Sequence, residues 1–120
     1  MCSVYEMDQF EIEIVGGIAD VLRRIESLVE RTLKKELKQT EIQDEADELR
    51  VVFNVVNREA TCSPWLFDDV TDDLWMCLVF ASEFCRNFYS RRISETPYFH
   101  KYLEYKQLVR GWILDSDYLG

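Results

Sequence analysis

Residues Pro64–Ile93 read PWLFDDVTDDLWMCLVFASEFCRNFYSRRI, and within them Leu74–Ala81 is the longest apolar run of the chain. At spacings of three and four, one apolar stripe is formed by Leu74, Leu78, Ala81, Cys85 and Phe88. These spacings place the stripe along one side of a helix. Further apolar residues widen the stripe, as expected of a helix packed on several sides. We therefore predict a central buried helix over residues 72–92.

Three more helices are expected, two before this segment over residues 18–38 and 41–58 and one after it over residues 97–114. The first keeps apolar residues at helical spacing from Ile18 to Leu37 and collects lysines near its end, where the helix dipole favours them. The second follows Thr40, which has Gln43 three residues later, the spacing of a capping box. The third follows Thr96-Pro97, a helix-start signal. Together they predict an all-α bundle of about four helices.

An α+β fold is the alternative prediction. Residues 10–14 alternate apolar and acidic side chains, so the segment 1–17 is expected to be an N-terminal arm or to hold a short strand near 10–15. The β-branched run in Val51–Val56 could supply the partner strand near 50–56. The capping signal and the apolar period favour a helix there instead.

Length and composition indicate one domain over residues 1–120, with 48% hydrophobic residues available for a core. The N-terminus lacks the pattern of a secretion signal, and no apolar run is long enough to span a membrane. Cys77 and Cys85 lie about 12 Å apart along one helix, too far to form a disulfide. We therefore expect reduced thiols, a cytoplasmic protein and no membrane partner.

The chain carries a formal net charge of −9. Phosphate binding requires a basic face, so this composition argues against direct binding of duplex nucleic acid. An acidic surface instead suits a basic protein partner, because complementary fields steer the encounter.

Motifs for catalysis and cofactor binding are absent from the sequence. There is no glycine-rich phosphate loop and no CxxC pair, and the single histidine, His100, has no second ligand at metal-binding spacing. We therefore predict a protein that is not an enzyme and that carries no cofactor or metal.

Acidic residues are concentrated more densely than helix starts require, since one or two carboxylates per start would complement the dipole. The excess predicts a binding surface for a basic partner, with two aromatic residues from a loop as apolar anchors. The expected partner-binding residues are Glu41, Asp44, Glu45, Asp47, Glu48, Asp68, Asp69, Asp72, Asp73, Trp65 and Phe67. The expected function is that of a small acidic inhibitor, of the immunity or antitoxin type, that occludes a nuclease or another nucleic-acid-binding protein.

Two other classes of function remain open. The apolar excess of the central helix could cover a subunit interface in a helical homo-oligomer with a structural role, a homodimer being the simplest case. In the C-terminal third, basic residues alternate with aromatic residues, a composition that can hold single-stranded nucleic acid. The residues concerned are Arg86, Arg91, Arg92, Lys101, Lys106, Arg110, Phe88, Tyr89, Tyr98, Phe99, Tyr102 and Tyr105.

Overall fold

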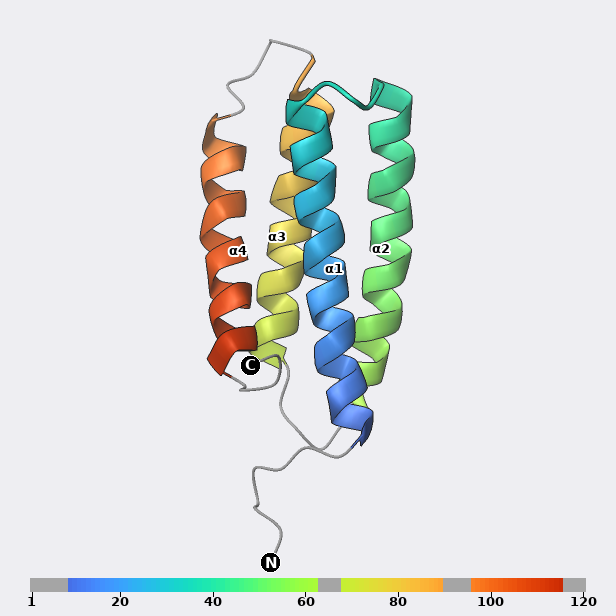
Figure 1. Ribbon diagram of the computed structural model, residues 1–120, viewed down its shortest axis with the longest axis vertical. Helices are drawn as coiled ribbons and strands as arrows, with labels where there is room; N and C mark the ends of the chain where they lie inside the picture. Colours follow the sequence, from blue (N-terminus) through green and yellow to red (C-terminus); the bar gives the residue numbers. More distant parts are fainter. Residues whose placement is uncertain (1–8, 63–67, 90–95, 116–120) are drawn as a thin grey trace, which may run out of the picture.

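A computed structural model describes residues 9–62, 68–89 and 96–115. It contains four helices in the order α1 (Gln9–Leu33), α2 (Gln39–Thr61), α3 (Asp68–Asn87) and α4 (Thr96–Asp115). Each helix runs antiparallel to the one before it, so the bundle has an up-down-up-down course (Figure 1). The predicted all-α four-helix bundle is confirmed, and the described residues contain no strand.

The alternative prediction, with strands near 10–15 and 50–56, is wrong, because both segments are helical. Residues 9–17 form the first turns of α1 rather than an arm, and Ile14 and Val15 are fully buried in the core. Gly17 allows α2 to approach, since a Cβ atom there would lie 3.1 Å from Val56 Cγ2. Gly16 and Gly17 both lie within α1.

Helix α1 ends earlier than predicted, at Leu33 instead of residue 38. Lys35 adopts a left-handed backbone with φ 58°, which a helix cannot continue. The Glu36 amide donates to the Arg31 carbonyl over 2.9 Å, which is the 6→1 bond of the Schellman motif that commonly closes a helix C-terminus. Leu37 then returns to the core at 3% exposure, although it is no longer helical.

Helix α2 begins two residues before the predicted start. The cap residue is Lys38, not Thr40, and its backbone amide donates to Glu41 Oε1 over 2.8 Å. The carboxylate thus satisfies an amide that would otherwise lack a partner at the helix start. Beyond the cap, the buried side of α2 has the helical spacing expected from the sequence: Ile42, Ala46, Leu49, Phe53, Val56 and Ala60.

Helix α3 is the central helix, as predicted, and it packs against each of the other three. It begins at Asp68 and ends at Asn87, rather than spanning 72–92. Cys77, Ala81 and Cys85 form a row of small, fully buried side chains on this helix. The Cys85 thiol lies 4.0 Å from the Leu28 carbonyl of α1, so this row faces α1 and permits a close approach.

The cross-section of the bundle is a diamond rather than a square. Helices α1 and α3 touch across the short diagonal, whereas α2 and α4 make no contact over the described residues. Figure 1 shows α4 and α2 on the two outer sides of the central pair. The contact between α1 and α4 is slight compared with that between α3 and α4.

A small ionic cluster joins α4 to α1. Glu26 Oε2 of α1 lies 3.4 Å from Lys106 Nζ and 3.5 Å from Arg110 Nη1 of α4. Lys106 also lies over the ring of buried Tyr102, 5.7 Å from its centroid. Because Glu26 and Lys106 are 28% and 20% exposed, water screens this pair less than the surface pairs within single helices.

The two neighbouring glycines of α1 provide a matched test of helix packing. Gly16→Ala adds a methyl group to open space and should raise the free energy of unfolding by about 1 kcal/mol through helix propensity. Gly17→Ala places the same group against Val56, so its gain should be smaller or reversed. Urea denaturation measures both values, and equal gains would contradict the close packing of α1 on α2.

The ionic cluster predicts an asymmetric effect of two glutamate substitutions. Glu26→Gln should lower the free energy of unfolding by about 1 kcal/mol, because it leaves two cations of α4 without their partner. Glu30→Gln removes only the exposed pair with Lys34 within α1 and should lower the free energy of unfolding much less than Glu26→Gln does. Chemical denaturation at low and high salt measures the difference, and similar losses in both variants would contradict a tie between α1 and α4.

Candidate protein-binding surface

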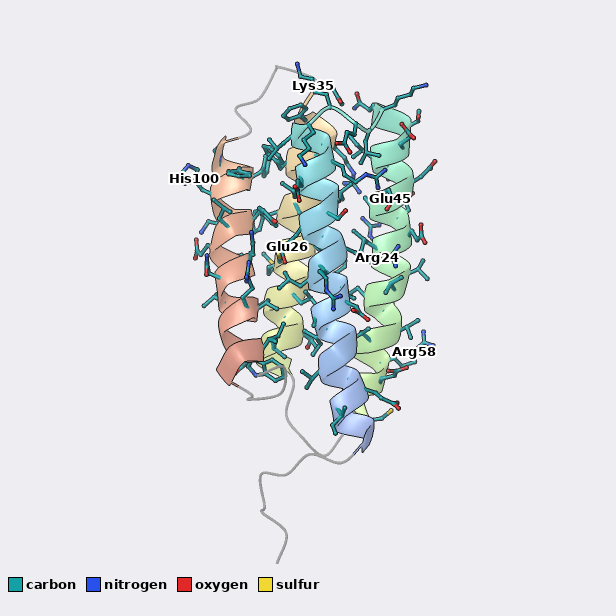
Figure 2. The ribbon with its side chains drawn as sticks, in the orientation of Figure 1. Arg24, Glu26, Lys35, Glu45, Arg58 and His100 are labelled. Atoms are coloured by element: carbon teal, nitrogen blue, oxygen red, sulfur yellow. The ribbon has the colours of Figure 1, made fainter. Side chains whose placement is uncertain are left out.

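The first half of α2 carries the densest group of carboxylates, namely Glu41, Asp44, Glu45, Asp47 and Glu48. Four of them, all except Asp47, lie within about 100° of arc on the helix, because their separations are three and four residues. Glu45 is partly exposed and the others are exposed. Figure 2 shows Glu45 on this upper part of α2. The group therefore forms one surface of the helix.

Local partners engage some of these side chains but not all. Glu41 accepts the capping bond from Lys38, and Asp47 accepts a bond of 2.9 Å from the Gln43 amide. Glu48 lies 3.2 Å from Arg24 of α1, with both side chains largely exposed. Asp44 and Glu45 form no ion pair among the described residues, which leaves their charge available to a partner.

The second acidic group lies at the start of α3, where Asp69 and Asp72 are exposed and Asp73 is partly buried. Asp68 is the first residue of this helix. Burial, and then the charges of Asp69 and Asp72, raise the pKa of the Asp73 carboxyl above its ordinary value. Burial and the two nearby carboxylates both disfavour the charged form of Asp73.

The two acidic groups do not form a common surface. Since α2 and α3 run antiparallel, their starts lie at opposite ends of the bundle (Figure 1). The separation is most of the length of α2, about 30 Å at 1.5 Å per residue. The predicted apolar anchors, Trp65 and Phe67, lie outside the described residues. The two acidic groups therefore do not belong to one compact binding site.

Exposed apolar residues beside the α2 carboxylates were not anticipated as part of a site. Val51 is 63% exposed and Val55 is 47% exposed, on the same side of the helix as Asp44 and Glu48. A hollow of about 500 Å³ lies between α1 and α2, lined by Asp20, Arg23, Arg24, Ser27 and Val52. A helical projection of 41–58 could have identified both valines, because they fall opposite the buried row.

The basic and aromatic residues of the C-terminal third are mostly engaged within the fold. Lys106 and Arg110 bind Glu26, and Arg86 lies 3.0 Å from Glu83. The rings pack on one another across α3 and α4, with centroids 5.0 Å apart for Phe84 and Phe99 and 5.9 Å apart for Phe80 and Tyr105. Arg91 and Arg92 lie outside the described residues. The described part of this segment therefore offers few free cations for phosphate.

Reactive groups do not converge anywhere in the described part of the chain. His100 is exposed on the outer side of α4 (Figure 2). Burial raises the pKa of the Cys77 thiol to about 12 and that of Cys85 to about 11, so both remain protonated core residues. Within the described residues, no group of three or more possible ligands could hold a metal ion, and no helix could span a membrane.

Asp73→Asn should stabilise the protein at neutral pH. A raised folded pKa means that the folded state binds this proton more tightly than the unfolded state, so stability falls as pH rises through the carboxyl range. The substitution removes that loss. Asp73 is the sixth residue of α3, where the dipole contributes little. Thermal melts at neutral pH should show the gain, and melts near pH 3, where the carboxyl is largely protonated, should show less of it. Equal gains at the two pH values would contradict the raised pKa of Asp73.

Comparisons with protein-family models, with curated proteins and with solved structures found no match to this chain.

Proposed function

We propose that this protein is a non-catalytic binding module that engages a basic protein partner through the acidic first half of α2. The observation that carries the proposal is the presence of four carboxylates on one side of this helix, three of which form no ion pair within the described residues. Such a surface attracts a basic partner over long range and speeds association.

The mechanism we propose is occlusion. A protein that binds nucleic acid presents lysines and arginines where phosphates lie, and the α2 carboxylates would occupy those positions instead. An inhibitor of the immunity or antitoxin type acts in this way, and a nuclease is the kind of partner that suits it. The acidic group of α3 lies at the other end of the bundle and would act only on the overall field.

The two rival functions have different support. The engagement of Lys106 and Arg110 by Glu26 weighs against nucleic-acid binding by the C-terminal third. The outer side of α3 bears partly exposed apolar residues, Trp75, Met76, Val79 and Phe80, between two helices that do not touch each other. A homo-oligomer would use this surface, and a sedimentation series over concentration would detect it.

The central test compares two charge-neutralised variants in a pull-down. The first replaces Glu41, Glu45 and Glu48 with Gln and Asp44 and Asp47 with Asn, which keeps side-chain size and leaves an acceptor for the Lys38 amide. We expect this variant to lose basic partners that the unmodified protein retains at moderate salt. The matched control, Asp69/Asp72/Asp73→Asn, neutralises carboxylates at the opposite end and should retain them.

Two outcomes would contradict the proposal. In one, the α2 variant captures the same partners as the unmodified protein. In the other, both variants lose them in proportion to the charge removed, which would indicate a general effect of net charge. Circular dichroism of each variant establishes that the helices are intact.

A further inference from the structure

One side of α2 combines carboxylates with apolar residues that the fold leaves uncovered. Asp44, Glu48, Val51 and Val55 follow one another at spacings of four, three and four, so they form a continuous stripe along the helix. We call these four residues the α2 stripe. All four are exposed, and the valines are among the few large apolar residues that the described bundle exposes by more than about a third. The stripe spans about 16 Å, or three helical turns.

A hollow between α1 and α2 opens beside the α2 stripe. Its volume is about 500 Å³, and Val52 lines it from α2. Arg24, which also lines the hollow, pairs with Glu48 of the stripe over 3.2 Å. A helix that lies on Val51 and Val55 could therefore reach past this pair and place an aliphatic side chain against Val52 in the hollow.

Negative charge is concentrated at one end of the stripe. Asp44 and Glu48 lie at its N-terminal end, with Glu41 and Glu45 beside them, whereas beyond Val55 the exposed residues Arg58 and Glu59 offset each other; Figure 2 labels Arg58. A helix naturally carries acidic residues near its start and basic residues near its end. The complementary arrangement is therefore an antiparallel helix with its basic C-terminal turns over Asp44 and Glu48.

We infer that the α2 stripe binds an amphipathic α-helix of the basic partner, antiparallel to α2. Aliphatic side chains of that helix cover Val51 and Val55 and enter the hollow over Val52, and its last turns supply lysine or arginine to Asp44 and Glu48. This mode of recognition reads anchors at helical spacing. The inference rests on the proposed function and adds the secondary structure, direction and apolar contacts of the partner.

The probe for this inference is a pair of synthetic helical peptides of about five turns with the same composition. Both carry a leucine row at helical spacing; one has its lysines in the last two turns and the other has them in the first two. We expect the first peptide to bind more tightly, and we expect amide shifts in a nitrogen-15 spectrum to centre on Asp44, Glu48, Val51 and Val55. Equal affinity for the two peptides would overturn the direction.

The apolar part of the stripe is tested with Val51→Thr/Val55→Thr, which preserves side-chain shape and removes apolar surface. Affinity for the first peptide should fall by about tenfold, which corresponds to about 1.4 kcal/mol. Leu108→Thr on α4 is the matched control, because Leu108 is also 50% exposed but lies on another helix, and its loss should stay below about twofold. The amide spectrum of each variant reports whether the bundle is folded.

The outcomes separate this inference from the proposed function. Loss of peptide binding in the α2 carboxylate variant but not in the threonine variant would retain the basic-partner proposal and overturn the stripe. Loss in neither variant would overturn both. Amide shifts centred on Trp75, Met76 and Val79 of α3 would overturn the stripe in favour of the other side of the bundle.

Discussion

The direct contact between α1 and α3 determines the shape of this bundle. Cys77, Ala81 and Cys85 are small enough to bring the two helix axes together, and the larger side chains of α1, including Ile25 and Leu28, fill the space beside them. When one diagonal of a four-helix bundle is short, the helices on the other diagonal move apart. Helices α2 and α4 consequently pack on the central pair alone and keep broad outer sides.

These outer sides are where the chain shows its least typical surface chemistry. Helix α2 leaves most of the Val51 side chain exposed and carries carboxylates one to two turns away from it. Helix α4 differs because Lys106 and Arg110 reach Glu26 and Tyr102 lies beneath Lys106, so its cations mostly serve the fold. Of the two outer helices, α4 thus pairs Lys106 and Arg110 with Glu26 within the fold, whereas the carboxylates of α2 mostly face solvent.

Much of the architecture could be predicted from the sequence, because helical periodicity is a local property that burial then reinforces. The boundaries could not, since they depend on backbone features that residue type conceals. A lysine occupies the left-handed position at 35, where glycine is usual, and a lysine amide rather than a hydroxyl side chain defines the start of α2. The alternating segment before Gly16, predicted as an arm or a short strand, is difficult for a similar reason. Residues 10–14 fit both the strand period and the helix period, and packing against α2 selects the helix.

The acidic residues illustrate the same limit at the level of the surface. Their density could be read from the chain, but their separation follows from topology, since consecutive antiparallel helices begin at opposite ends. This separation could be predicted from four helices with short connections. The exposure of Val51 could be predicted as well, because the buried row from Ile42 to Ala60 leaves Val51 on the opposite side of the helix. The hollow between α1 and α2 could not be predicted, because it depends on how the two helices pack.

The two thiols on the α1–α3 contact give access to the motions of this bundle. An alkylating reagent can reach the buried thiols of Cys77 and Cys85 only when the helices packed around α3 move apart, whereas Cys62 is exposed at the end of α2 and needs no such opening. The rates of thiol modification at these positions therefore compare transient separation of the central helices with simple solvent access. A contact made from small, sulfur-containing side chains thus doubles as a chemical reporter of its own opening.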